Sequence, residues 1–264
     1  MNYFAFESAA ERYARGRPFF HPLVIEHVKK LLSLRLPVAR GLDVGCGTGL
    51  SAVALKHLAR KVVGIDAAPA MLARAPRDAR IRYLAATAEQ LPFGNDRFDL
   101  MTLSQVCHWL DRERFFSEAR RVLRPAAWLI IYDAYFSSEM IANPEFQAWY
   151  RTEFRARYPT PPRARLTFKG EDATTAPFGL RGEDHLQHAF TFTARRLVDY
   201  LLTQSNVIAM VECGAEDIRA VRRWLEKSVE PFFAESNEAD FVFNLAVWRL
   251  QSKKRLTKRR PKGV

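Results

Sequence analysis

The chain has 264 residues, 48% of them hydrophobic, which is enough for one large α/β domain with a full core. A net charge of +12 would suggest a nucleic-acid partner, but seven uncompensated basic residues lie in 253–262, and residues 1–252 carry 34 basic and 29 acidic residues. We therefore expect residues 253–264 to form a basic disordered tail and do not favour a nucleic-acid partner; the alternative is that this tail binds RNA or an anionic membrane surface.

Cysteine content and hydropathy indicate in which cellular compartment the protein is expected. The three cysteines are widely spaced and odd in number, which predicts reduced thiols and neither a disulfide framework nor a metal site. The longest apolar run, Ala126–Tyr132, is far shorter than the roughly 20 residues that a membrane span needs. No apolar run near the start has the form of a signal peptide. We expect a cytoplasmic protein without a membrane span.

Residues 1–36 precede the first predicted strand and are expected to form an N-terminal helical cap. Apolar residues at helical spacing predict a helix from about Leu23 to Leu34. The segment before it, Tyr13–Pro22, reads YARGRPFFHP.

The central motif is an apolar run, Ala39–Val44, that leads into glycines at positions 45, 47 and 49 and then into a helix-like segment, Leu50–Ala59. Glycine allows positive φ and a close approach between a ligand and the backbone. The start of a helix offers free N–H groups. Strand, tight turn and helix in this order indicate a nucleotide-like ligand.

A second buried strand, Lys61–Asp66, ends in an acid 17 residues after Gly49. Doubly wound folds place a carboxylate there to accept both hydroxyls of a ribose. The dinucleotide fingerprint has its third glycine three positions after the second, whereas this chain reads G-x-G-x-G. The run LDVGCGTG, Leu42–Gly49, resembles the first motif of class I S-adenosylmethionine-dependent methyltransferases. A NAD-dependent enzyme is the alternative.

The resemblance covers roughly residues 10–250. It implies a doubly wound α/β fold with a seven-stranded Rossmann-like sheet, whose last strand is inserted antiparallel. It also implies S-adenosylmethionine as cofactor, S-adenosylhomocysteine as product and no metal. The cofactor-binding residues that it implies are Asp43, Gly45, Cys46, Gly47, Gly49, Asp66, Ala67, Met71, Thr87, Ala88, Glu89, Ser104 and Gln105.

The YARxRPxxxP pattern is similar to a segment that lies over the cofactor's methionine and the active site in small-molecule methyltransferases of the trans-aconitate type. By that resemblance Tyr13 and Arg17 contact cofactor or substrate. The alternative is that Tyr13 packs and Arg17 is a surface charge.

Two positions depart from the family pattern. The third strand is predicted over Ile81–Thr87, and Thr87 stands where members commonly have an aspartate that accepts a hydrogen bond from the adenine amino group. A neutral hydroxyl is the weaker acceptor. Ala126 and Ala127 stand where members usually have two glycines after a proline. We expect this turn to be restricted but retained.

The fourth strand, Phe98–Ser104, ends at Gln105, His108 and Trp109. Ligands of open α/β sheets bind outside the carboxyl ends of the strands, so these residues are expected to face the methyl group. The Ser-Gln-x-x-His-Trp motif also resembles that of small-molecule methyltransferases of the ubiquinone and trans-aconitate types. His108 and Tyr13 are the candidate catalytic bases. Packing is the alternative for His108.

A helix over Asp111–Leu123 and a fifth strand over Ala126–Tyr132 follow. Residues 135–184 are expected to be a substrate lid inserted after the fifth strand, because so long a segment between strands is often functional. Its amphipathic helix, Asn143–Tyr158, carries an aromatic stripe that could equally be core. Together with the two residues named above, the stripe completes the predicted substrate-binding set, which is Arg17, Trp109, Trp149 and Tyr150.

The remaining segments complete one methyltransferase domain over residues 1–252. A strand is predicted over Leu186–Thr193, helices over Ala194–Leu202 and Glu216–Phe233, and a closing strand over Ala239–Leu250.

The favoured function is O-methylation of a carboxylate or hydroxyl on a small molecule. The alternatives are C-methylation of a quinone-like ring, an RNA methyltransferase, and a cofactor-binding protein without turnover. Enzymes that methylate exocyclic amines resemble one another in an Asn/Asp-Pro-Pro-Tyr/Phe tetrad, and Ser104–Cys107 stands in its place. We expect a monomer or homodimer whose partner is a small-molecule methyl acceptor.

Overall fold

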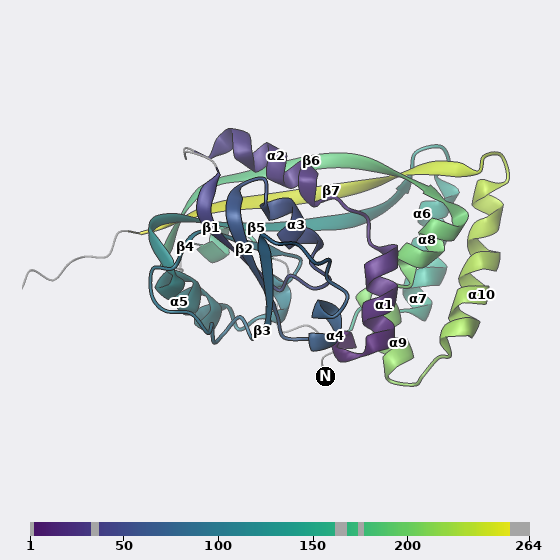
Figure 1. Cartoon of the computed structure of the whole chain (residues 1–264). Helices are drawn as coiled ribbons and strands as arrows, with labels where there is room; N and C mark the ends of the chain where they lie inside the picture. The colour runs from purple at the N-terminus through teal and green to yellow at the C-terminus, as the bar shows by residue number, and fades with distance from the viewer. Residues whose placement is uncertain (1–2, 33–36, 162–167, 174–176, 254–264) are drawn as a thin grey trace, which may run out of the picture.

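The computed structural model describes residues 3–32, 37–161, 168–173 and 177–253. Within them, seven strands form one sheet in the order β3-β2-β1-β4-β5-β7-β6 (Figure 1). The strand bounds are β1 Val38–Val44, β2 Ala59–Asp66, β3 Ile81–Ala85, β4 Phe98–Ser104, β5 Leu123–Met140, β6 Phe178–Thr193 and β7 Glu238–Ser252. β7 is antiparallel to both neighbours, and the other pairs are parallel. This is the doubly wound α/β fold with the inserted antiparallel strand that the sequence predicts.

Helices cover both faces of the parallel part of the sheet. On one face, α2 (His21–Leu31) and α3 (Leu50–Leu55) pack against side chains such as Leu100 and Ile130. On the other face, α5 (Arg112–Val122) packs against their strand neighbours Met101 and Ile131. The alternation follows from the two-residue period of a strand. Both faces of the central strands are therefore buried, and ligands can reach the sheet only at the strand ends.

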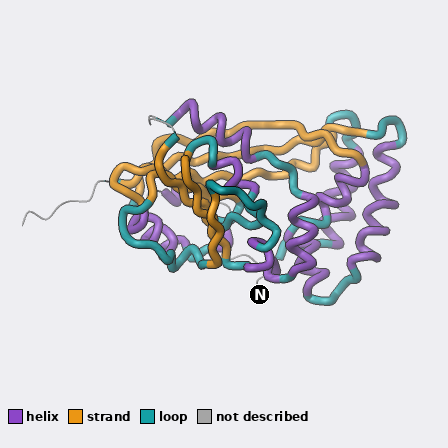
Figure 2. Tube along the Cα trace, viewed as in Figure 1, coloured by secondary structure: helices purple, strands orange, loops and turns teal. Residues whose placement is uncertain are grey.

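A second helical group lies at the far end of the long strands β5, β6 and β7 (Figures 1 and 2). Its members enclose a separate aromatic-rich core. They are α6 Glu145–Trp149, the π-helix Tyr150–Phe154, α7 Arg155–Arg157, α8 Ala194–Leu201, α9 Ser205–Glu212, α10 Ile218–Val229 and the 3₁₀ helix Glu230–Phe233. α1 (Glu7–Gly16) contacts α8 and also α4 (Pro69–Leu72), so the N-terminal segment joins this group to the sheet. Short 3₁₀ helices also occur at Tyr3–Ala5, Cys107–Trp109 and Gly170–Ala173.

Several boundaries differ from the sequence predictions. The helix after the glycines ends at Leu55, because Ala59 already pairs with Val38 in the sheet. β6 starts at Phe178, well before the predicted Leu186, because β7 supplies a partner along its whole length. α9 was not predicted. The predicted basic tail, apart from Lys253, lies outside the described residues.

The turn predicted at Ala126 and Ala127 lies within β5, where the pairing with β4 shifts register between Phe98 and Leu100. Ala126 has φ of +62°, a left-handed conformation that glycine adopts without a Cβ penalty. Ala126 is therefore strained at an irregularity within a continuous strand, and the separate turn that the sequence predicts is not found.

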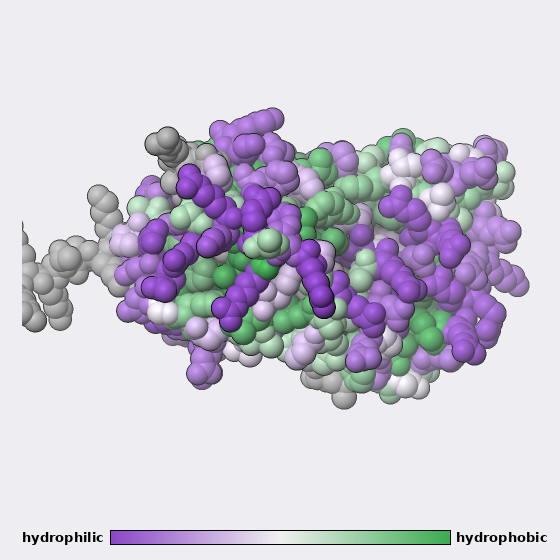
Figure 3. Space-filling view, in the orientation of Figure 1, coloured by the Kyte–Doolittle hydropathy of each residue, from purple (hydrophilic) through white to green (hydrophobic). Residues whose placement is uncertain are grey.

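Hydrophilic side chains predominate on the face shown in Figure 3. Among the described residues, no helix combines the length and the apolarity needed to cross a membrane.

Candidate active site

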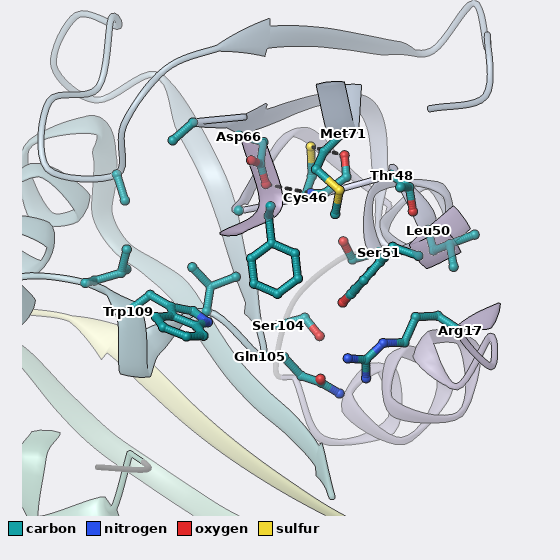
Figure 4. A pocket seen from close by; sticks show the side chains of 18 of the residues that line it. Arg17, Cys46, Thr48, Leu50, Ser51, Asp66, Met71, Ser104, Gln105 and Trp109 are labelled. Carbon is teal, nitrogen blue, oxygen red and sulfur yellow. Dashed lines mark hydrogen bonds between the residues drawn. The ribbon is translucent and has the colours of Figure 1, made fainter. Parts of the chain in front are cut away.

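A cavity of about 390 Å³ opens at the carboxyl ends of β1, β2 and β4 (Figure 4). Side chains from the N-terminal segment close its other side, among them Tyr13 and Arg17. It lies where the strand order reverses between β1 and β4, which is the usual ligand site of an open α/β sheet. In Figure 4, Arg17 and Gln105 lie toward one end of the cavity and Asp66 toward the other.

The glycine loop forms one wall with its backbone. Gly45, Gly47 and Gly49 have φ of +67°, +53° and +83°. A Cβ on Gly45 would lie 2.5 Å from Cγ2 of Val106, and a Cβ on Gly49 would lie 2.5 Å from the Tyr83 hydroxyl oxygen. Both conformation and space therefore require glycine here.

Asp66 ends β2 and lines the same cavity. Its Oδ2 accepts a hydrogen bond from the Gly47 N–H at 2.8 Å, and its Oδ1 accepts one from the Ala68 N–H at 2.8 Å. Burial raises the pKa of this carboxyl, while the hydrogen bonds from Ala68 and Gly47 oppose the rise. A carboxylate has about four acceptor positions, so Asp66 can still accept hydrogen bonds from ligand hydroxyls.

Asp43, a predicted cofactor-binding residue, does not line the cavity. It is completely buried behind the glycine loop, where it accepts hydrogen bonds from the hydroxyls of Ser51 and Thr102. Burial raises its pKa to about 7, although both hydrogen bonds oppose the rise. Asp43 therefore joins the start of α3 to β4. Gly49 is likewise absent from the lining and acts as the N-cap of α3.

The N-terminal segment contributes Arg17. Its guanidinium carbon lies 4.6 Å from the centroid of the Tyr13 ring and 5.6 Å from that of Tyr200. Its Nη2 donates to the Thr203 carbonyl oxygen at 3.0 Å. No described carboxylate forms an ion pair with Arg17. This cation therefore suits an anionic ligand group.

The end of β4 contributes Ser104, Gln105 and Trp109. Gln105 has φ of +55°, and its side-chain Nε2 donates to the Ala134 carbonyl oxygen at 3.0 Å. A left-handed residue other than glycine or asparagine is strained, and such strain concentrates at functional sites. Trp109 packs edge-on against Phe4 at 6.2 Å between ring centroids, which closes the cavity on that side.

Most of the other predicted site residues also meet here. The predicted residues that line the cavity are Tyr13, Arg17, Gly45, Cys46, Gly47, Asp66, Ala67, Met71, Thr87, Ala88, Glu89, Ser104, Gln105 and Trp109.

Three further predicted residues lie elsewhere, and their assignments are corrected. His108, a predicted base, lies in the 3₁₀ helix after β4, packs its ring 5.1 Å from that of Trp109 and does not line the cavity. Trp149 and Tyr150 belong to the core of the second helical group. Tyr150 stacks on Phe154 at 4.8 Å and donates its hydroxyl proton to Gln204 Oε1 at 2.8 Å. The aromatic stripe is therefore core, and residues 145–157 of the predicted lid do not reach the cavity.

Sequence reasoning missed several residues that line the cavity. The most important of them is His21, because its imidazole can donate or accept a proton. It begins α2, and its Nδ1 forms a 2.9 Å hydrogen bond with the Tyr132 hydroxyl at the end of the parallel part of β5. Burial, and then the charge of Arg17, lower its pKa to about 3, so the imidazole is neutral. No local pattern reveals a contact between residues 111 positions apart. The other missed residues are Phe4, Phe20, Thr48, Leu50, Ser51, Ala86, Val106 and Leu110.

No metal centre is evident in the parts of the chain that the structure describes, since no three His, Cys, Asp or Glu side chains converge there as ligands. The site accordingly consists of a backbone cradle, one acceptor carboxylate, an arginine and a neutral histidine.

Comparisons with known proteins agree with this geometry. Residues 42–131 match the model of a methyltransferase domain. An uncharacterized methyltransferase of Mycobacterium tuberculosis is 29% identical over 241 residues, which cover 88% of this chain and 89% of that protein. A Thermus thermophilus demethylmenaquinone methyltransferase is 38% identical over 110 residues, or 39% of this chain and 50% of that protein.

Solved structures show the same fold. A protein of Anaeromyxobacter dehalogenans assigned as a type II methyltransferase superposes with a TM-score of 0.69 at 21% identity, covering 89% of this chain and 97% of that one. The YcgJ protein of Bacillus subtilis gives a TM-score of 0.53 at 18% identity, covering 88% and 98%. The matched domain and these relatives identify residues 42–131 as a methyltransferase domain, and the solved structures show that the chain has the class I methyltransferase fold.

Proposed function

We propose that this methyltransferase transfers the methyl group of S-adenosylmethionine to an oxygen atom of a small molecule. The observation that carries the proposal is the single continuous cavity that joins the glycine loop to the N-terminal side chains Tyr13 and Arg17. Its 390 Å³ lies at the low end of the range of small-molecule sites, about 300–1,000 Å³. Cofactor and acceptor must share it, which favours a small acceptor.

The residues present fit S-adenosylmethionine. The cradle at Gly45 and Gly47 leaves room that a Cβ would remove. Asp66 has acceptor capacity for two ribose hydroxyls, while Thr87 and Glu89 line the cavity beyond it and suit the adenine. When bound, the cofactor supplies an electrophilic methyl group on a sulfonium.

Arg17 completes the binding set. Since no described carboxylate pairs with it, we assign it to the carboxylate at the methionine end of the cofactor, beside the acceptor. A guanidinium can hold such a group by charge-assisted hydrogen bonds. The Tyr13 ring lies 4.6 Å from the guanidinium carbon and stabilises its position by a cation–π contact.

The side chains near the acceptor hold it in place and shield it from water. Phe4, Phe20 and Trp109 line the cavity and exclude water from the reacting atoms. Holding an acceptor in line with the methyl group can lower the barrier by about 7–11 kcal/mol in well-oriented cases. Such positioning is the main catalytic task in methyl transfer.

Methylation of a ring carbon is the second candidate. The relative from Thermus thermophilus is named for a quinone-type acceptor, and the aromatic walls of this cavity suit a flat ring. The same cofactor site serves both reactions, so the acceptor atom decides between them.

The proposal is tested by incubating the purified protein and S-adenosylmethionine with panels of small carboxylic acids, phenols, aliphatic alcohols and hydroquinones. We expect S-adenosylhomocysteine to form with an oxygen acceptor, and nuclear magnetic resonance of the product to show an O-methyl group. A C-methyl product would favour the second candidate. Cofactor binding without turnover of any panel member, but with turnover of RNA, would overturn small-molecule methylation.

A further inference from the structure

His21 stands in the cavity wall in one fixed orientation. Its ring stacks on Phe20 at 4.2 Å between centroids, with 29° between the planes, and meets Tyr132 edge-on at 5.8 Å. The Nδ1 hydrogen bond to the Tyr132 hydroxyl fixes the remaining rotation of the ring. Three contacts from two elements thus aim the opposite nitrogen, Nε2.

Nε2 is available to a ligand. The residue retains 8% of its surface, and it lines the cavity. Nε2 forms no hydrogen bond with the described residues, and it is not one of the described polar atoms that are buried without a partner. We therefore infer that Nε2 is exposed to the cavity. Nδ1 is already bonded, and His21 can therefore make its next hydrogen bond only through Nε2.

The two carboxylates that line the cavity already accept hydrogen bonds from backbone N–H groups, near the position that we assign to the cofactor. Asp66 receives the N–H groups of Gly47 and Ala68, and Glu89 receives the Asp111 N–H at 3.1 Å. Arg17 is only a donor. His21 is the cavity-lining imidazole of the described chain and lies beside Arg17, where the acceptor must enter.

The Tyr132 hydroxyl permits the tautomer that a base needs. Tyr132 is fully buried and pairs with Ser104 in the sheet register, and Ser104 Oγ is a buried oxygen without a hydrogen-bond partner among the described residues. If the Tyr132 proton points to Ser104, the Tyr132 oxygen accepts from Nδ1–H of His21. Nε2 then carries the free lone pair.

We propose, resting on the function proposed above, that His21 Nε2 is the catalytic base that takes the proton of a phenol-type hydroxyl as that oxygen is methylated. The aromatic walls formed by Phe4, Phe20 and Trp109 suit the ring of such an acceptor. An ionised carboxylate would need no base, and a neutral imidazole gives it no countercharge.

The step balances in atoms and electrons. The acceptor oxygen uses a lone pair to form the O–CH₃ bond, the C–S bond of the sulfonium breaks with its pair kept by sulfur, and the hydroxyl proton passes to Nε2. The products are an aryl methyl ether, a thioether and an imidazolium that later loses its proton to solvent. A weakly basic imidazole suffices, because a protonated ether is a far stronger acid than an imidazolium.

The test uses the full-length protein and a series of para-substituted phenols from 4-methoxyphenol to the acidic 4-nitrophenol. We expect His21→Ala to lower kcat for 4-methoxyphenol by about 100-fold, the lower end of general-base effects. The loss should shrink toward 4-nitrophenol, which ionises without help. Added imidazole should restore part of the lost rate.

The matched control is His27→Ala on the same helix, whose side chain faces Asp184 at 3.6 Å and lies outside the cavity. It should leave kcat within about 2-fold, since no change at the reacting atoms is made. Calorimetry with S-adenosylhomocysteine, and His21→Gln as a second variant, detect a fold defect. His21→Gln should keep cofactor affinity within about 2-fold of wild type but not gain rate from imidazole.

The outcomes separate the two proposals. An equal loss for every phenol, no imidazole rescue, or a wild type that methylates carboxylic acids but no phenol would overturn the role of His21 and leave small-molecule methylation intact. A wild type that binds the cofactor and methylates no small molecule would instead overturn the proposed function.

Discussion

The backbone N–H of Gly47 donates a hydrogen bond to Oδ2 of Asp66 at 2.8 Å, across 19 residues of sequence. The parallel register of β1 and β2, with Val44 beside Ile65, brings the two strand ends together. The positive φ of Gly47 allows the loop to turn toward the carboxylate. One acid therefore both shapes the loop and remains available to a ligand.

Gly45→Ala is expected to damage both stability and cofactor binding. The new Cβ would lie 2.5 Å from a methyl group of Val106, on a residue at φ of +67°. The left-handed conformation alone costs about 1–2 kcal/mol. We expect a lower thermal midpoint and a dissociation constant for S-adenosylhomocysteine raised at least about 10-fold.

Gly179→Ala is the matched control for this change. Gly179 lies in β6, and a Cβ there would meet nothing within 4 Å. Replacing an unstrained glycine is neutral or stabilises by about 0.4–1 kcal/mol. Equal damage by the two substitutions would contradict the close contact at Gly45. Thermal unfolding and calorimetry on both variants provide the comparison.

Asp43→Asn is expected to change how stability depends on pH. The pKa of Asp43 is raised from 3.8 to about 7 by burial, so between these values the folded state holds a proton that the unfolded chain loses. The free energy of unfolding therefore falls as pH rises through this window and is level above it. Asparagine does not titrate, so the free energy of unfolding of Asp43→Asn does not fall in this way as pH rises.

Relative to wild type, Asp43→Asn should thus gain a few kcal/mol between pH 4 and pH 7.5, at roughly 1.4 kcal/mol per pKa unit. Urea unfolding at the two pH values measures the difference. The exposed Asp240→Asn serves as the control. If the stability difference between Asp43→Asn and wild type is constant with pH, the buried carboxyl does not titrate as described.

Arg17→Met is expected to weaken ligands that carry a carboxylate. Hydrogen bonds to charged groups contribute about 1.5–3 kcal/mol, so affinity for S-adenosylhomocysteine should fall about 10-fold or more. Affinity for 5′-methylthioadenosine, which lacks the amino-acid end, should not change. Arg15→Met, an exposed site on α1 paired with Glu11, is the control. Equal effects on the two ligands would argue against the carboxylate assignment.

Tyr150→Phe is expected to affect stability and not the acceptor. The change removes the hydroxyl that donates to Gln204 Oε1 at 2.8 Å. Loss of one such hydrogen bond lowers the free energy of unfolding by about 0.5–1.5 kcal/mol. The KM for the acceptor should stay unchanged, because Tyr150 does not line the cavity. An increased KM with unaltered urea unfolding would return Tyr150 to the substrate site.

The part of the cavity that we assign to the cofactor was predictable because its signals are contiguous. Three glycines, a following helix and an acid at the end of the next strand can be recognised in order, and Gly45, Gly47 and Asp66 do meet at the cavity. Parallel strand order then follows from the same alternation of strands and helices. Asp43 was misplaced because a motif shows which residues are adjacent but not which side of the loop each faces.

The part that we assign to the acceptor was less predictable because its contacts are long-range. His21 and Tyr132 meet across 111 residues, and only the folded sheet shows that the start of α2 reaches the end of the parallel part of β5. The aromatic stripe containing Trp149 was visible as an apolar helix face. Periodicity does not show what such a face covers, and here it packs against Trp224 at 5.9 Å in the second helical group.

The most direct test of the account is calorimetric titration of the wild type, Asp66→Ala and Asp78→Ala with S-adenosylhomocysteine. Asp78 is a carboxylate outside the cavity that forms an ion pair with Lys56. We predict that wild type and Asp78→Ala bind alike and that Asp66→Ala binds at least about 10-fold more weakly, since it loses hydrogen bonds to a charged acceptor. Unchanged affinity in Asp66→Ala would contradict the placement of the cofactor in this cavity.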